Sequence, residues 1–263
     1  MRILTFRFLF VLGVLSFAVG CKLSDEDKET IINVSPEFSL DLFESLGDTR
    51  QFQVLIKTVE PQACKNDVID YSSNKTGNRL LLSLHEIIPT PDCNTGESLV
   101  NAEASFGFLE NQTYDVEITL KDVLQNLGKL TVSESAYKLE LETMDGIELV
   151  HHELKRVPAN HIWGYAAYEN KESSEALALG FINALKGKSS NSYFQVGYYG
   201  YFSINDNGQL LMAAAPEFPF SSTFHYKYDG SLADLEQLLA SYRDNQNEQA
   251  FKIAIYTSDG KEL

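Results

Sequence analysis

The side chains best suited to binding lie in an aromatic segment, residues 193–202, which reads YFQVGYYGYF. If this segment is one strand, its side chains alternate between two faces, and most of the tyrosines lie on the less apolar face. Aromatic side chains with a polar tip suit stacking on sugars or packing against protein, because they combine apolar area with a hydrogen-bonding group. An earlier strand, residues 161–168, adds two aromatic residues to the same face. We predict ligand contacts at Trp163, Tyr165, Tyr193, Tyr199 and Tyr201.

The aromatic face also has other interpretations. In one interpretation it packs against the first domain or a second copy of the chain. In another it is an ordinary strand surface, where tyrosine is favoured. Aromatic sheet faces also bind RNA. However, the 263-residue chain holds 21 lysines and arginines against 37 aspartates and glutamates, a formal net charge of -16. Because so acidic a chain offers no basic surface for a phosphate backbone, nucleic acid is excluded as a partner.

The histidines give only a weak indication of a metal or catalytic site. His151 and Glu153 share a face if their strand continues, but two candidate ligands without a third indicate an exposed strand end. His85, His161 and His225 are isolated in the sequence, and no nucleophile, zinc, phosphate-loop or dinucleotide motif occurs. We therefore expect no metal, no cofactor and no assigned catalytic residue. A carboxylate pair assembled only in the fold stays open, because 37 acidic residues allow many combinations.

The first twenty residues have the order of a secretory signal. Arg2 and Arg7 come first with no acid, residues 8–17 are apolar, and small residues precede Cys21. The apolar run is too short for a membrane-spanning helix, which needs about 20 residues. We predict that residues 1–20 are a signal peptide and are removed.

Residues 18–21, Ala-Val-Gly-Cys, resemble the lipobox of bacterial lipoproteins. The resemblance implies that Cys21 becomes the N-terminus and is acylated, and two acyl chains anchor a protein stably because each buried methylene contributes about 0.8 kcal/mol. The acidic residues 22–29 resemble the export signal of Bacteroidota surface lipoproteins, which implies an outer-membrane, outward-facing protein. We therefore predict that residues 21–36 are a lipidated acidic tether. Two alternatives stay open: Cys21 is an ordinary signal-peptide cysteine, or the acidic residues 22–29 are only a solvated tether without an export signal.

If Cys21 carries lipid, Cys64 and Cys93 remain as a pair in an oxidising compartment. Such a pair is typical of a disulfide. A metal site or a reactive thiol would need a CxxC spacing or a local base, and the sequence has neither. The loop-entropy model gives this crosslink roughly 3.5 kcal/mol of stabilisation.

Two domains with different patterns follow the tether. Residues 37–155 contain short segments of alternating or continuous apolar character separated by turn signals, which predict an all-β, immunoglobulin-like β-sandwich. Residues 156–263 follow the order β-α-β-β-(β)-α-β, which predicts an α+β ferredoxin-like sandwich. Within the second domain, residues 193–204 are expected to be one strand, and residues 205–208, Asn-Asp-Asn-Gly, a hairpin turn.

These observations favour a lipid-anchored outer-membrane lipoprotein that acts by binding a glycan or a surface protein, rather than by catalysis. Its membrane contact would be the lipid on Cys21. The alternative is a membrane-anchored hydrolase whose site is assembled between the two domains. The two hypotheses differ in whether the fold brings together carboxylates or histidines, or instead displays an aromatic face.

Overall fold

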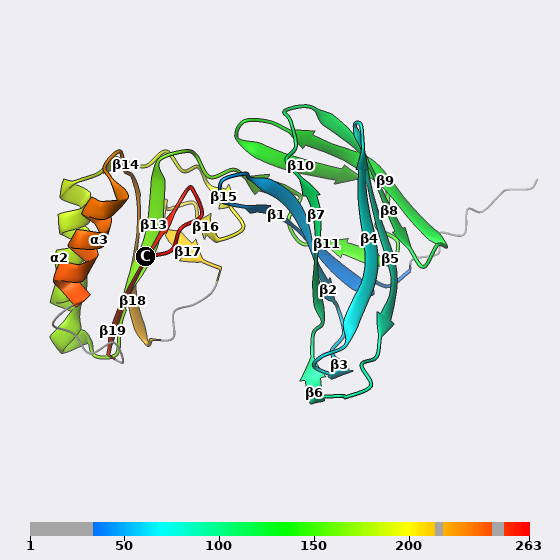
Figure 1. The fold of residues 1–263 in the computed structure, drawn as a ribbon, viewed down its shortest axis with the longest axis horizontal. Coiled ribbons are helices and arrows are strands. Elements are labelled where there is room, and N and C mark those ends of the chain that lie inside the picture. Colours follow the sequence, from blue (N-terminus) through cyan, green and yellow to red (C-terminus); the bar gives the residue numbers. More distant parts are fainter. Residues whose placement is uncertain (1–33, 214–217, 244–249) are drawn as a thin grey trace, which may run out of the picture. The chain divides into compact units, whose positions relative to one another are not determined.

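The computed structural model describes residues 34–213, 218–243 and 250–263 (Figure 1). The predicted signal peptide and Cys21 lie outside the described residues. The described chain is mostly β, as predicted, and the helices within it are α2 (Lys171–Gly187) and α3 (Leu232–Arg243).

Two large sheets and the two-stranded ribbon β3-β6 contain the strands between residues 38 and 155. One large sheet has the strand order β11-β1-β2-β7 and the other β12-β10-β9-β8-β5-β4. Most neighbours are antiparallel, but β1 pairs with β11 and β5 with β8 in parallel. The strands are β1 (Phe38–Ser45), β2 (Gln51–Thr58), β3 (Gln62–Cys64), β4 (Val68–Thr76), β5 (Arg79–Ile88), β6 (Thr95–Ser98), β7 (Asn101–Gly107), β8 (Thr113–Leu120), β9 (Leu124–Val132), β10 (Ala136–Leu141), β11 (Ile147–Leu149) and β12 (Glu153–Lys155).

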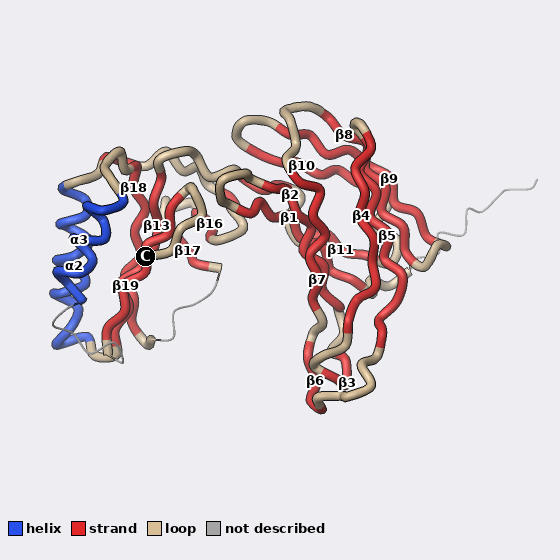
Figure 2. The backbone as a smooth tube through the Cα atoms, viewed as in Figure 1, coloured by secondary structure: helices blue, strands red, loops and turns tan. Residues whose placement is uncertain are grey.

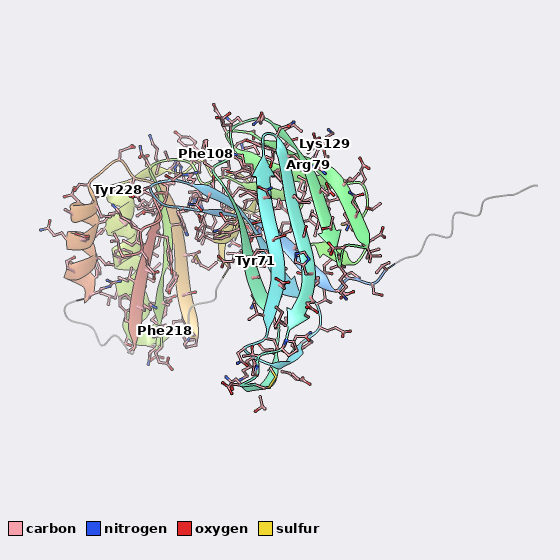
Figure 3. All side chains as sticks on the ribbon, turned by 45° about the vertical axis from the view of Figure 1, so that its right-hand side comes forward. Tyr71, Arg79, Phe108, Lys129, Phe218 and Tyr228 are labelled. Atoms are coloured by element: carbon pink, nitrogen blue, oxygen red, sulfur yellow. A yellow bond between two sulfur atoms is a disulfide. The ribbon has the colours of Figure 1, made fainter. Side chains whose placement is uncertain are left out.

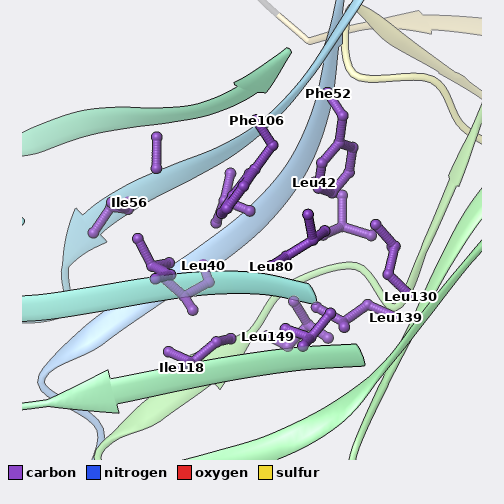
Figure 4. Close-up of a cluster of buried hydrophobic side chains, with 14 of the residues drawn as sticks. Leu40, Leu42, Phe52, Ile56, Leu80, Phe106, Ile118, Leu130, Leu139 and Leu149 are labelled. Carbon is purple, nitrogen blue, oxygen red and sulfur yellow. The ribbon is translucent and has the colours of Figure 1, made fainter. Parts of the chain in front are cut away.

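Alternating side chains explain why these sheets share one core. In β1, Phe38, Leu40 and Leu42 are buried while the residues between them are partly exposed. The inward side chains of both sheets form one apolar cluster, shown in part in Figure 4. Since alternate residues of a strand point to opposite faces, the intervening residues of β1 must face away from this core.

The outer face of the six-stranded sheet carries paired charges. Arg79 and Lys129 lie on this sheet (Figure 3). Arg79 contacts Glu117 on the neighbouring strand, and Lys129 contacts Asp115 at 3.1 Å. The hydrogen bond from Arg79 lowers the pKa of Glu117. Because these charges neutralise each other on an exposed surface, this face is a solvated one.

A disulfide closes the ribbon of β3 and β6, as predicted. Cys64 and Cys93 are bonded, with their Cα atoms 5.2 Å apart. Asn66 extends the connection, because its Nδ2 donates to the carbonyl of Asp92 at 2.8 Å and its Oδ1 accepts from the amide of Asn94 at 2.8 Å. The two crosslinked loops are therefore held together by side chains as well as by the disulfide.

The chain after residue 156 forms a four-stranded sheet, β14-β18-β13-β19, and a three-stranded sheet, β15-β16-β17. Both helices pack on one face of the four-stranded sheet, through the apolar cluster that includes Phe181, Leu235 and Phe224 (Figure 2). The strands are β13 (His161–Tyr168), β14 (Ser190–Asn191), β15 (Gly197–Tyr198), β16 (Phe202–Ile204), β17 (Leu210–Met212), β18 (Phe220–Lys227) and β19 (Phe251–Thr257).

The prediction of one continuous strand over residues 193–204 is wrong. The segment breaks into β15 and β16, which pair with each other across a turn. Gly200 lies in that turn with a φ of 81°, and a Cβ there would lie 2.9 Å from the ring of Phe43. The turn therefore depends on a residue that tolerates a positive φ and a close neighbour.

Candidate functional site

The structure buries most of the aromatic residues predicted to contact a ligand. Trp163 is 1% exposed, Tyr165 6% and Tyr199 4%, and Tyr201 is half-buried. Tyr193 differs, with 74% of its surface exposed. The expectation of an open tyrosine face is thus wrong for all but Tyr193, and the structure does not bring the five residues together on one accessible surface.

The small sheet β15-β16-β17 covers this face and causes the burial. The ring centroid of Trp163 lies 5.1 Å from that of Phe202 and 5.9 Å from that of Tyr201. Tyr201 also packs on Phe43, with ring centroids 4.9 Å apart, and its hydroxyl accepts a hydrogen bond from the amide of Leu46 at 3.1 Å. This agrees with the alternative interpretation, in which the aromatic face packs against the first domain.

A groove on the outer face of β1, β2 and β7 is the more accessible candidate site. It has a volume of about 480 Å³. The strand register places its residues directly opposite one another, so that their side chains share one face. They form two rows across the three strands, Ser39–Lys57–Asn101 and Asp41–Leu55–Glu103.

The groove combines hydrogen-bond donors and acceptors with apolar surface. Asp41 and Glu103 carry carboxylates, which accept hydrogen bonds, whereas Lys57 is a donor and an asparagine amide is both. Leu55 and the half-exposed Val150 supply apolar contact area. A site of this composition can bind a molecule that presents hydroxyl groups beside apolar C–H surface.

A three-residue cluster forms the edge of the groove. Nδ1 of His151 lies 3.0 Å from Oδ1 of Asp41 and 3.1 Å from Oδ2. The His151 ring stacks on Tyr198, with ring centroids 3.7 Å apart and planes 9° from parallel. Burial, followed by the charge of Asp41, raises the pKa of Tyr198, so its hydroxyl stays protonated and can donate to Asp41. The Asp41 carboxylate is therefore held in place before any ligand arrives.

The residues considered as metal ligands in the sequence do not converge. His151 contacts Asp41, while Glu153 pairs with Lys155 at 2.7 Å. Within the residues that the structure describes, no group of three or more histidine, cysteine, aspartate or glutamate side chains is placed to hold a metal ion.

Comparisons of the chain with protein-family models, with curated proteins and with solved structures found no match. In the described ranges, neither helix has the length and apolar character needed to cross a membrane.

The sequence predictions do not include the groove, because they centre on the aromatic residues of 161–168 and 193–202. Asp41 lies on β1, and its neighbours Leu55 and Glu103 lie on β2 and β7. The available signal was the alternation in residues 38–45, FSLDLFES, which places Ser39 and Asp41 opposite the apolar residues.

Proposed function

We propose that the protein binds a glycan in the groove of β1, β2 and β7. The observation that carries this proposal is the grid of carboxylates, amine and amide around Leu55 on one accessible sheet face. Sugar hydroxyls both donate and accept hydrogen bonds, so they match a surface that offers Asp41 and Glu103 as acceptors and Lys57 as a donor. The volume of about 480 Å³ falls in the range of small-molecule sites.

The paired charges on the other outer face support this choice of site. There, Arg79 and Lys129 are already bonded to carboxylates on neighbouring strands. In the groove, Lys57 and Glu103 form no ion pair with each other in the part of the chain that the structure describes, and both residues are exposed. Lys57 and Glu103 can therefore exchange water for a ligand at small cost, whereas a bonded pair must first be broken. Asp41 is bonded to His151, but a carboxylate has about four acceptor positions and keeps capacity for a ligand.

We propose in addition that lipid on Cys21 anchors the protein in the outer membrane, facing outward. The support is the lipobox-like residues 18–21 and the acidic residues 22–29. The test is Cys21→Ser, with membrane fractionation and mass measurement of the N-terminal peptide. Loss of acylation and release from the membrane fraction are expected, and unchanged processing and retention would refute lipidation at this residue.

We also propose a division of the chain into two domains of known fold type. An immunoglobulin-like domain over residues 37–155 is supported by the two large sheets that share one core. A ferredoxin-like domain over residues 156–263 is supported by the strand order β14-β18-β13-β19 and by two helices on one sheet face. The paired edge strand β14 has only two residues, which is short for that fold.

A glycan array tests the binding proposal. The protein would be the chain from residue 22 onward, which keeps the whole compact unit 34–263. Asn101→Ala removes one groove amide, and Gln125→Ala, on the outer face of the other sheet, is the matched control. We expect a glycan signal that Asn101→Ala weakens and Gln125→Ala leaves unchanged. An array without signal, or capture of a protein partner at the groove instead, would overturn the glycan proposal.

A further inference from the structure

A serine and a histidine that are isolated in the sequence meet at the edge of the C-terminal sheet. Ser192 follows β14, and His225 lies on β18. The register of these strands pairs Ser190 with Lys227 and Asn191 with Tyr226, so the next step places Ser192 opposite His225. The structure shows a hydrogen bond between Ser192 Oγ and His225 Nδ1.

The other ring nitrogen of His225 determines the direction of this hydrogen bond. Nε2 lies 3.1 Å from the carbonyl oxygen of Gly208. A carbonyl can only accept, so Nε2 carries the proton and Nδ1 of the neutral ring is the acceptor. The hydroxyl of Ser192 therefore donates to Nδ1, which is the arrangement of a serine beside its general base.

The turn that carries Gly208 holds the carbonyl in place. Gly208 has a φ of 73°, and its amide donates to the carbonyl of Asn205 at 2.8 Å. The side chain of Asn205 accepts from the amides of Asn207 at 3.0 Å and Gln209 at 2.9 Å. The histidine is thus oriented by a backbone group of a well-bonded turn, in the role that a carboxylate has in a catalytic triad.

Open space lies beside the pair. A hollow of about 480 Å³ is lined by Ser192 and His225 together with Asn191, Lys186 and Tyr226. Alternation places Ser192 and His225 on the sheet face away from the helices, whereas Asn191, opposite Tyr226, and Lys186 of α2 line the part of the hollow on the helix side. The hollow is lined by both polar and aromatic side chains, which suits a small polar ester better than a long acyl chain.

We propose that Ser192 and His225 form a nucleophilic pair that hydrolyses short-chain carboxylic esters. Ser192 Oγ bonds to the acyl carbon while its proton passes to Nδ1 of His225, and the imidazolium then gives that proton to the departing alcohol. Water attacks the acyl-serine, His225 takes a proton from it, and the acid leaves as Ser192 regains its proton. The balance requires only ester and water, and the proposal does not rest on the glycan groove.

An active-site-directed fluorophosphonate tests the pair on the chain from residue 22 onward. We expect one label, located on Ser192 by peptide mass spectrometry, and none in Ser192→Ala or His225→Gln. We also expect hydrolysis of p-nitrophenyl acetate to fall at least about 100-fold in each variant, because general-base catalysis contributes roughly 10² or more. Ser190→Ala, two residues away on β14, is the matched control and should label and turn over like the unmodified chain.

Three outcomes would overturn the proposal: no label on the unmodified chain, a label that persists in Ser192→Ala, or an unchanged hydrolytic rate in Ser192→Ala. Circular dichroism and thermal unfolding show whether each variant is folded. If His225→Gln does not fold, the decision rests on Ser192→Ala, whose side chain lies at a partly exposed loop position.

Discussion

His151 contacts Asp41 through Nδ1 at 3.0 Å, although the two residues are 110 positions apart in the sequence. This contact joins the segment after β11 to the middle of β1, and it fixes the carboxylate that lies at one end of the groove. Tyr198, stacked on the other side of the imidazole, adds a contact from the C-terminal part of the chain.

The first prediction concerns the way His151 holds the Asp41 carboxylate in place. His151→Phe keeps a ring to stack on Tyr198 but removes the hydrogen bond to Asp41. Loss of one such bond costs about 1 kcal/mol, so we expect glycan affinity to fall roughly fivefold. Isothermal titration measures the change, and His152→Phe, at an exposed neighbouring position, is the control. Equal affinity in the two variants would show that His151 has no positioning role.

The second prediction separates packing from binding in the aromatic segment. Trp163→Ala removes a buried ring from the core formed with Tyr201 and Phe202, and should lower the free energy of unfolding by about 3–5 kcal/mol. Tyr193→Ala, at an exposed site, should change it by less than about 0.5 kcal/mol. Urea denaturation followed by circular dichroism measures both. A small effect at Trp163 would contradict its burial.

The third prediction concerns a buried carboxylate. Glu44 is 2% exposed, and its Oε1 accepts from the hydroxyl of Tyr137 at 2.8 Å and lies 2.9 Å from Arg156. Arg50 contacts Oε2 at 3.2 Å and also donates to the carbonyl of Ser258. Glu44→Gln leaves both arginines without a counter-charge.

We expect Glu44→Gln to destabilise the protein by about 3 kcal/mol, the low end for broken buried pairs, because both arginines keep some contact with water. Urea denaturation measures this change. Glu140→Gln, in the exposed pair with Lys138, is the control and should change the unfolding midpoint little. If the two variants unfold alike, the buried cluster does not stabilise the fold.

The fourth prediction concerns the stability of the fold at acid pH. His161 Nδ1 donates to the carbonyl of Ala159 at 2.9 Å, and Nε2 accepts from the amide of Tyr193 at 3.3 Å, so both nitrogens are satisfied in the neutral ring. Burial is the main cause that lowers the pKa of His161 below 6.5. The unfolded chain therefore binds this proton at a higher pH than the folded chain does.

The stability that His161 contributes is consequently present above about pH 6.5 and is lost as the pH falls from there through the folded pKa. His161→Gln should flatten the decline in unfolding free energy below that pH, while His152→Gln, at an exposed site, should not. Chemical denaturation across this pH range gives both slopes, and parallel slopes in the two variants would contradict the assignment.

Local patterns predicted those parts of the structure that depend on near neighbours in sequence. Helix α3 shows such a local pattern, because Ser231 and Asp234 exchange hydrogen bonds at its first turn. The disulfide followed from counting cysteines once Cys21 was set aside. The mostly β character followed from the short apolar segments.

The remaining features depend on contacts between distant segments. Tyr199 is of a residue type that is common in surface contacts. It is buried because of the turn at Gly200 and the packing of β16 over Trp163. Likewise, Ser192 and His225 are 33 residues apart, and a strand register that no local pattern reveals brings them together.

The most direct test of the glycan proposal is isothermal titration of the array-identified glycan with Asp41→Asn and Asp115→Asn. Both changes remove one charge with little change in shape, but Asp41 lies in the groove and Asp115 on the outer face of the other sheet. Hydrogen bonds to charged groups are worth about 1.5–3 kcal/mol, so Asp41→Asn should raise the Kd roughly 10- to 100-fold. Asp115→Asn should bind like the unmodified protein. Unchanged affinity in Asp41→Asn, or an equal loss in both variants, would contradict binding in the groove.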